Sequence, residues 1–209
     1  GAMARPTKEE ARDTRRLILD AALELFAEAG FSGASMRELA RRVGVRESAL
    51  YHHFESKAAI FGALLEEFGP GKLQRFAELD VVALPPAEFE PFLKSIARTL
   101  MEEAARPREL TFTRLLMAEG PRLKGAGVLH EAMLPGYAHL AQFFAELARR
   151  GVVRPGDPEL YAVEFLGPLM MLRLSYLLLA EGDRERLHAL VDAHVRHFCE
   201  SVKVREEPR

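Results

Sequence analysis

The side chains best suited to chemistry in this sequence lie together in the stretch VGVRESALYHHFESK, residues 43–57. It holds two adjacent histidines, a tyrosine, two serines and two basic side chains. Three kinds of site use such groups: a metal centre, a nucleophile with its general base, or a surface that binds a large anion. Each kind of site makes a different demand on spacing.

The spacing argues against a metal centre and against a nucleophile. His52 and His53 are neighbours, so on a helix their side chains diverge by about 100° and do not readily face one metal ion. Helical zinc sites place their ligands three or four residues apart. Ser48 and Ser56 have no base at a predictable distance, and the chain contains no G-x-S-x-G, P-loop or dinucleotide-binding motif. We therefore expect no catalytic residue, no metal ligand and no cofactor.

An anion-binding surface is favoured by the helices that position these side chains. Arg37, Arg46 and Lys57 fall at the starts of three expected helices. A cation there is unfavourable by about 0.3–1 kcal/mol, because the N-terminal end of a helix is already positive. Three such cations are explained if an external anion approaches the helix ends, whose free N–H groups bind phosphate. Ordinary solvated charges are the alternative.

Periodicity predicts helices around this stretch. Apolar residues recur at helical spacing up to Gly30, and the capping-box pattern S-x-x-E that begins at Ser35 opens a second helix. Gly44 separates it from a short helix at residues 47–53, and Ser56 caps a fourth that runs to about residue 68. Three short helices with a glycine turn are typical of a helix-turn-helix arrangement.

The rest of the chain also reads as helix, and no segment alternates with a period of two. We therefore predict an all-α protein of about nine helices. A tag scar and flexible N-terminal arm are expected at residues 1–12, a three-helix helix-turn-helix domain at 13–61 and a larger helical domain at 62–209. The further helices are expected at residues 91–106, 109–119, 128–150, 159–181 and 183–202.

Composition is that of a soluble globular protein, with 48% hydrophobic and 29% charged residues. The single cysteine, Cys199, excludes an intrachain disulfide and suits a reducing cytoplasm. No run of eighteen apolar residues occurs, so we expect no membrane partner. The net charge of −2 argues against indiscriminate coating of nucleic acid, but it allows a local basic face.

The runs SMRELA, VGV and LYHHF, followed by Lys57, resemble the DNA-binding domain of the tetracycline-repressor (TetR) family of transcriptional regulators. Phe26, Gly30 and Phe31 fit the same pattern. The resemblance covers about residues 13–61, and beyond them it is one of architecture and length. It implies that the third helix lies in the major groove of double-stranded DNA. The DNA-binding residues expected on this basis are Ser35, Arg37, Arg46, Glu47, Ser48, Ala49, Tyr51, His52, His53 and Lys57.

These residues divide by expected role. Residues 46–49 and Tyr51 would face base edges, and Arg46 would pair bidentately with a guanine. Tyr51, His53 and Lys57 match positions that hold phosphates, and Ser35 caps the helix aimed at the DNA backbone. Leu50 and Phe54 would seal the small core. His52 stands at a variable position and takes either role.

Two features at the edges of this domain remain open. Arg46 stands where the family often has a serine or threonine cap, so we expect a less well capped start of the third helix. Arg12, Arg15 and Arg16 either extend the phosphate contacts, or reach a minor groove, or form a solvated helix face.

The larger domain is expected to dimerise and to bind an effector. One helix-turn-helix reads too few base pairs to find an operator, so two copies would bind a palindromic site. The family pairs the last two helices of each copy, which here places Leu166, Met170, Leu174, Leu187, Leu190, Val191, His194 and Phe198 at the interface. The middle helices would enclose a pocket for a small apolar or aromatic effector, although core packing is the alternative for each residue. The expected pocket residues are Met101, Phe112, Arg114, Leu115, Leu116, His130, Met133 and Tyr137.

We therefore predict a cytoplasmic, sequence-specific DNA-binding regulator and not an enzyme. In the simplest version it is a repressor that binds its operator as a homodimer and is released by the effector. An activator or an effector-independent regulator on the same fold is the first alternative. A helical enzyme or binding module that retains the N-terminal pattern is the second.

Overall fold

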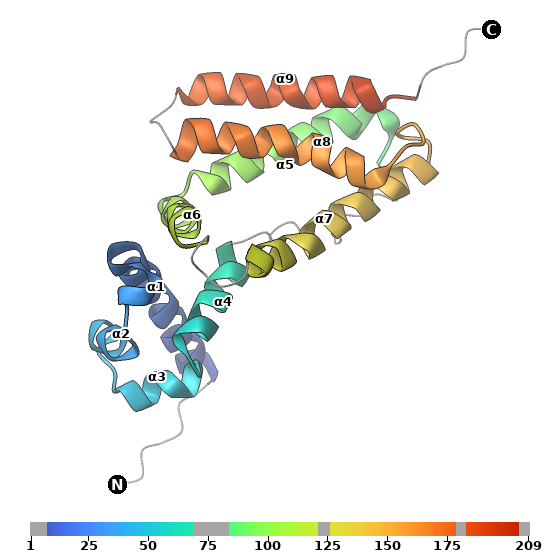
Figure 1. Cartoon of the computed structure of the whole chain (residues 1–209). Helices are drawn as coiled ribbons and strands as arrows, with labels where there is room; N and C mark the ends of the chain where they lie inside the picture. Colours follow the sequence, from blue (N-terminus) through green and yellow to red (C-terminus); the bar gives the residue numbers. More distant parts are fainter. Residues whose placement is uncertain (1–7, 69–83, 121–125, 179–182, 205–209) are drawn as a thin grey trace, which may run out of the picture. The chain divides into compact units, whose positions relative to one another are not determined.

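The computed structural model describes residues 8–68, 84–120, 126–178 and 183–204, and these residues are almost entirely helical (Figure 1). They form nine α-helices and no strand, and an isolated antiparallel bridge joins Val153 to Lys203. The predicted all-α class is confirmed. The helices are α1 (Lys8–Gly33), α2 (Met36–Val43), α3 (Glu47–His53), α4 (Lys57–Phe68), α5 (Phe89–Ala104), α6 (Pro107–Glu119), α7 (Ala126–Arg149), α8 (Pro158–Arg173) and α9 (Arg184–Val202).

The chain forms two compact units, which are treated separately below. The N-terminal unit comprises Gly1–Gly69 and Thr111–Ala126, and the C-terminal unit comprises Pro70–Leu110 and Gly127–Arg209. The sequence-based division placed every residue after 61 in the larger domain. The structure instead groups α4 and most of α6 with α1, α2 and α3, because the apolar faces of these helices share one core.

The first helix is longer than expected and is broken near its end. It begins at Lys8, so residues 8–12 of the predicted flexible arm are helical, and residues 1–7 lie outside the described residues. The run Lys-Glu-Glu-Ala-Arg at residues 8–12 consists of good helix formers. At Gly30 the backbone turns to φ 71° and ψ 164°, a left-handed φ that glycine adopts without steric cost. The predicted helix end at Gly30 is thus a kink, after which one further turn leads to Gly33.

Local capping fixes the short helices that follow. The Oγ of Ser35 accepts a hydrogen bond from the backbone N–H of Glu38 at 3.1 Å, as the capping-box pattern predicts. Gly44 ends α2 in the left-handed conformation, φ 77°. The Oγ of Ser56 accepts from the backbone N–H of Ala59 at 3.1 Å and caps α4. These three caps set the bounds of α2, α3 and α4, and α3 spans the predicted residues 47–53.

Aromatic side chains form the centre of the N-terminal unit. Phe31 lies 5.5 Å from Phe26 and 5.4 Å from Phe61 between ring centroids, both edge to face. Phe112 of α6 joins this cluster, 6.4 Å from Phe61 and 5.5 Å from Phe68. Such aromatic pairs contribute about 0.5–1.5 kcal/mol each beyond the area they bury. They attach α6 to α1 and α4.

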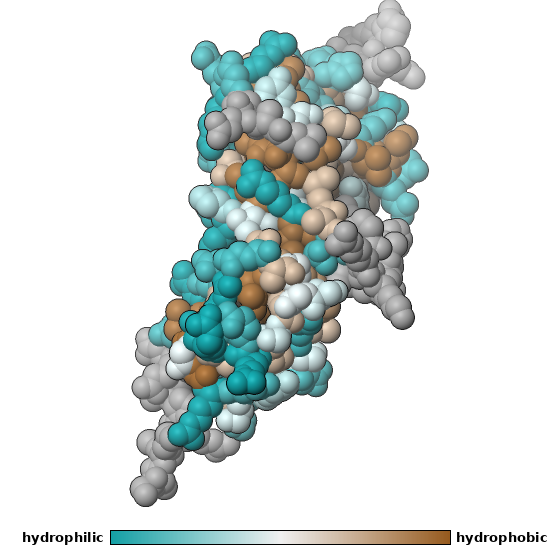
Figure 2. Space-filling view, turned by 60° about the vertical axis from the view of Figure 1, so that its left-hand side comes forward, coloured by the Kyte–Doolittle hydropathy of each residue, from teal (hydrophilic) through white to brown (hydrophobic). Residues whose placement is uncertain are grey.

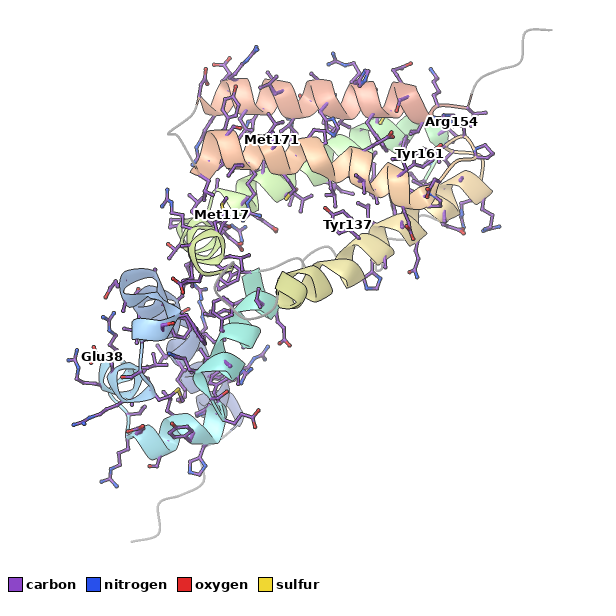
Figure 3. The ribbon with its side chains drawn as sticks, viewed as in Figure 1. Glu38, Met117, Tyr137, Arg154, Tyr161 and Met171 are labelled. Atoms are coloured by element: carbon purple, nitrogen blue, oxygen red, sulfur yellow. The ribbon has the colours of Figure 1, made fainter. Side chains whose placement is uncertain are left out.

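The C-terminal unit packs α5, α7, α8 and α9 around a second core. Phe144, Phe165 and Phe198 lie at its centre and contact one another at 5.4–6.0 Å. At the corner between α7 and α8, the hydroxyl of Tyr161 donates to the backbone carbonyl of Arg154 at 3.2 Å, and both side chains lie at this corner (Figure 3). This core gives α8 and α9 a fixed inner face and leaves their outer faces to solvent.

Candidate nucleic-acid interface

The third helix, α3, presents a row of polar side chains to solvent. Arg46 just before it and Glu47, Ser48, Tyr51 and His52 on it are exposed, whereas Ala49 and His53 are half-buried. Leu50 and Phe54 are 0% and 4% exposed and belong to the core of the N-terminal unit. The predicted core role of Leu50 and Phe54 is therefore confirmed, and the opposite face of α3 is available to a partner.

The N-terminal ends of α2 and α3 carry basic side chains. Arg37 follows the cap residue of α2, and Arg46 is the cap residue of α3 but makes no side-chain capping hydrogen bond. Both side chains are exposed, and neither forms an ion pair with any other residue in the described part of the chain. As expected from the missing serine or threonine, the first N–H groups of α3 lack a side-chain cap. They can therefore bind an oxygen from outside.

Two other arginines of α2 are already paired inside the unit. Glu38 accepts from Arg41 at 2.9 Å and 2.8 Å and from Arg42 at 3.4 Å, and Arg42 also donates to Glu28 at 2.6 Å. The hydrogen bonds from Arg41 and then Arg42 lower the pKa of Glu38 to about 2, so this carboxylate is ionised at neutral pH. The label on Glu38 in Figure 3 marks this cluster on α2. Among the arginines on α2 and at the start of α3, Arg37 and Arg46 are therefore the ones without an ion pair in the described residues.

Arg15 of α1 holds the other end of α3. Its guanidinium donates to the backbone carbonyl of His53 at 3.3 Å and lies 4.2 Å above the ring of Phe54. A cation at a helix C-terminus is favourable, because that end carries partial negative charge. The pKa of His53 is lowered, first by burial and then by the charges of Arg15 and His52. No spacing rule predicts a contact across 38 residues, so this role of Arg15 was missed from the sequence.

The side chain of Lys57 binds backbone groups within its own unit. Its ammonium donates to the backbone carbonyls of Phe31 at 2.5 Å and Ala34 at 2.9 Å, and it lies 4.6 Å above the ring of Phe31. An ammonium has three N–H donors, so two are occupied and one is left for a phosphate. The predicted phosphate contact of Lys57 therefore stays a prediction beside an internal structural role.

A hollow of about 480 Å³ opens beside the C-terminal end of α3, between α1 and α4. Arg15, Tyr51, His52 and His53 line it together with acidic and small residues of the loop and of α4. In the part of the chain that the structure describes, no three histidine, cysteine or acidic side chains converge to hold a metal ion. The hollow supplies hydrogen-bonding groups next to the exposed face of α3.

Comparison with known proteins identifies this arrangement. The family model described as bacterial regulatory proteins, tetR family, matches residues 18–64. The model described as AefR-like transcriptional repressor, C-terminal domain, matches residues 91–201, which is more than half of the chain. The chain belongs to the TetR family. It is therefore a DNA-binding transcriptional regulator with a helix-turn-helix, and not an enzyme.

Individual TetR-family relatives agree with this assignment over most of the chain. The regulator UidR of Escherichia coli K12 is 30% identical over 179 residues, 85% of this chain and 86% of its own length. SrpR of Pseudomonas putida is 30% identical over 152 residues, 73% of this chain and 67% of its own. The crystal structure of a TetR-family regulator from Mesorhizobium loti superposes with a TM-score of 0.68 at 24% identity, covering 95% of this chain and all of that one. The flavonoid-responsive regulator FrrA has a TM-score of 0.66 at 26% identity, covering 93% and 100%.

The residues predicted to line one effector pocket are divided between the two units. Phe112 and Leu115 are 1% and 4% exposed in the core of the N-terminal unit, and Leu116 packs against the same core. The apolar face of α6 packs against Phe61 and Phe68, so a place for these residues in an effector pocket stays a prediction. Arg114 is exposed on α6 and lines a groove of about 360 Å³ between α6 and α1.

The remaining pocket residues belong to the C-terminal unit. Met101 is 1% exposed in its core, and Tyr137 is half-buried against that core. Tyr137 projects from α7 on the side that faces α8 (Figure 3). His130 and Met133 lie on α7, but their side chains lie outside the described part of the structure. Tyr137 is thus the expected pocket residue that this structure leaves accessible within the unit.

The residues predicted at the dimer interface also divide into two sets. Leu166, Leu187, Val191 and Phe198 are between 0% and 3% exposed and form the core of their own unit. These side chains are covered within a single copy, so their contribution to an interface with a second copy stays a prediction. Met170 is 37% exposed, and Leu174, Leu190 and His194 are half-buried. His194 uses its Nε2 in a 2.8 Å hydrogen bond with the backbone carbonyl of Phe165.

Proposed function

We propose that the protein is a repressor that binds a palindromic operator as a homodimer and releases it when a small apolar or aromatic effector binds. The observation that carries the proposal is the exposed row on α3, flanked by the uncapped N-terminus at Arg46 and clamped at its other end by Arg15. The match to a family model described as the C-terminal domain of a transcriptional repressor supports repression over activation.

On the operator, α3 lies in the major groove and its exposed residues read base edges. Arg46 pairs with a guanine, Glu47 accepts from a cytosine amine, and the methyl group of Ala49 meets a thymine methyl. Ser35, Arg37, Tyr51, His53 and the third N–H of Lys57 hold phosphates on either side. His52, exposed at the rim, serves either purpose. This division of labour extends the separation of polar and core residues found on α3.

The dimer interface is proposed on the outward stripe of α8. Leu160, Val163, Met170 and Met171 are 50%, 54%, 37% and 61% exposed, and they recur at helical spacing on one face. In Figure 2 the surface of the C-terminal unit shows hydrophobic patches among hydrophilic side chains. The segment Pro158–Leu178 is long and apolar enough to cross a membrane by length and composition alone. Only 28% of its most apolar 18-residue stretch is buried within the chain. A second copy would cover this stripe, and dimers are typical of the family.

The effector is proposed to bind in the C-terminal unit beside Tyr137. In the core of this unit the rings of Phe92 and Phe143 stack at 6.1 Å, and Tyr137, Tyr176 and Leu177 are partly buried against the same core. Aromatic walls with a phenolic hydroxyl suit a flat apolar ligand. The related structure FrrA is flavonoid-responsive, which supports an aromatic effector. Its binding would favour a dimer in which the two α3 helices no longer match successive major grooves about 34 Å apart.

A reporter assay tests this function. Genomic fragments bound by the purified protein would be cloned before a reporter gene and measured with and without the protein, and with and without flavonoids or simple phenols. The proposal expects the protein to lower expression and an aromatic compound to restore it. Raised expression would identify an activator, and a response to no compound would identify an effector-independent regulator.

A further inference from the structure

The kink in α1 lies directly before the DNA-binding helices and is contacted from two sides. After Gly30 the chain makes one turn, Phe31–Gly33, and then reaches Ser35, the cap residue of α2. Any displacement of this turn moves Ser35, and with it the N-terminus of α2. We refer to Gly30–Ala34 as the kink segment.

From α4, Lys57 holds the far end of the kink segment. Its ammonium donates to the carbonyls of Phe31 and Ala34, and Phe31 is wedged between Phe26 and Phe61. These contacts lie within the helix-turn-helix domain and the helix α4 that follows it. They keep the kink segment attached to α4.

From α6, Glu119 closes over the near end of the kink segment. A Cβ placed on Gly30 would meet the Oε1 of Glu119 at 3.3 Å and its Cδ at 3.8 Å. Glu119 is only 7% exposed, although a buried carboxylate is costly to desolvate. Gly30 meets two demands at once, because its φ of 71° strains any other residue and because a Cβ there would press against Glu119.

We propose that Glu119 is a positioning residue for operator binding, acting through the kink segment on the N-terminus of α2. The proposal rests on the DNA-binding role argued above. It assigns to the last residue of α6 a contact that sets where Ser35 and Arg37 meet the DNA backbone. Loosening this contact lowers operator affinity without removing any group that touches DNA.

The test compares Glu119→Gln and Glu119→Ala with a matched control in the full-length protein. Glu109→Gln is that control, because Glu109 lies on the same helix and is 6% exposed, but it is ten residues before Glu119 in the chain. Operator affinity would be measured without effector, by fluorescence anisotropy on a DNA fragment selected by the wild-type protein. Thermal unfolding and amide hydrogen exchange at residues 35–39 would be measured on the same samples.

We expect the Glu119 variants to lose operator affinity by about 2- to 30-fold. This is the size of effect typical of mutations that alter a binding site without touching its ligand. Amide exchange should rise at the start of α2 at temperatures where the protein stays folded, and Glu109→Gln should show neither change. Operator affinity equal to that of the wild-type protein in the Glu119 variants would overturn the inference. The inference would also fail if Glu109→Gln lost as much operator affinity as the Glu119 variants and its melting temperature fell as theirs did. If the wild-type protein itself binds no selected fragment, it is the DNA-binding role that fails.

Discussion

Arg15 and Arg46 lie at opposite ends of α3 and do different work there. Arg46 is exposed at the N-terminal end, where a cation is unfavourable until an anion arrives. Arg15 is fixed at the C-terminal end by the carbonyl of His53 and the ring of Phe54. One arginine is therefore available to DNA, and the other secures the helix that presents it.

Replacing Arg15 by alanine tests this division at the residue scale. Loss of the cation–π contact and of the hydrogen bond should reduce the free energy of unfolding by about 1 kcal/mol and weaken operator binding about fivefold. Arg15→Lys should remain impaired, because an ammonium lacks the planar face that stacks on Phe54. Arg16→Ala, at an exposed neighbouring position on the same helix, is the control.

Salt dependence separates this role from a direct phosphate contact of Arg15. A lost phosphate contact reduces the slope of log affinity against log salt by about 0.9. We expect Arg15→Ala to keep the wild-type slope while the whole curve shifts to weaker affinity. A reduced slope with an unchanged free energy of unfolding would show that Arg15 binds phosphate. It would contradict the proposed role of Arg15 in holding the C-terminal end of α3.

At the scale of the elements, the bounds of a helix were predictable from the sequence where a capping residue marks its end. The pattern at Ser35, the glycine at Gly44 and the cap at Ser56 gave α2, α3 and α4 their observed bounds, because capping is a local interaction. What each helix packs against was not predictable. The apolar face of α6 is plain in the sequence, but only the fold shows that it contacts Phe61 and Phe68.

The inner and outer faces of α8 were not predictable from the sequence for a related reason. Helix α8 is apolar on most sides, so its sequence shows burial but does not separate the inner face from the outer one. The structure puts Leu166 and Leu169 inside and Leu160, Val163 and Met171 outside. Likewise, the sequence did not indicate that Arg15 contacts His53 or that Glu119 approaches Gly30, because these residues are far apart in the chain.

A charge on the outward stripe of α8 should disrupt the dimer. Met171→Glu would bury an unpaired carboxylate between two copies, costing about 2–4 kcal/mol, or roughly 30- to 700-fold in the dimer Kd. Analytical ultracentrifugation across a concentration series measures this change. Leu17→Glu, which alters a residue 58% exposed in the N-terminal unit, is the matched control and should leave the Kd unchanged. A monomer–dimer equilibrium unaffected by Met171→Glu would place the interface elsewhere.

At the scale of the whole molecule, the proposed function depends on two copies presenting two α3 helices to one duplex. Dimerisation doubles the number of base pairs read and imposes two-fold symmetry on the operator. Binding should also depend steeply on salt. With about 6–10 phosphate contacts, affinity is expected to fall roughly 10³–10⁵-fold between 50 and 200 mM salt.

The most direct test is selection of bound sequences from a random duplex library by the wild-type protein and by Arg46→Ala. We predict a palindrome whose half-site centres lie about 10–10.5 base pairs apart. We also expect Arg46→Ala to lose preference at one base position in each half-site and to keep the remaining positions. A selected site without two-fold symmetry, or the same preferences after Arg46 is replaced, would contradict these predictions.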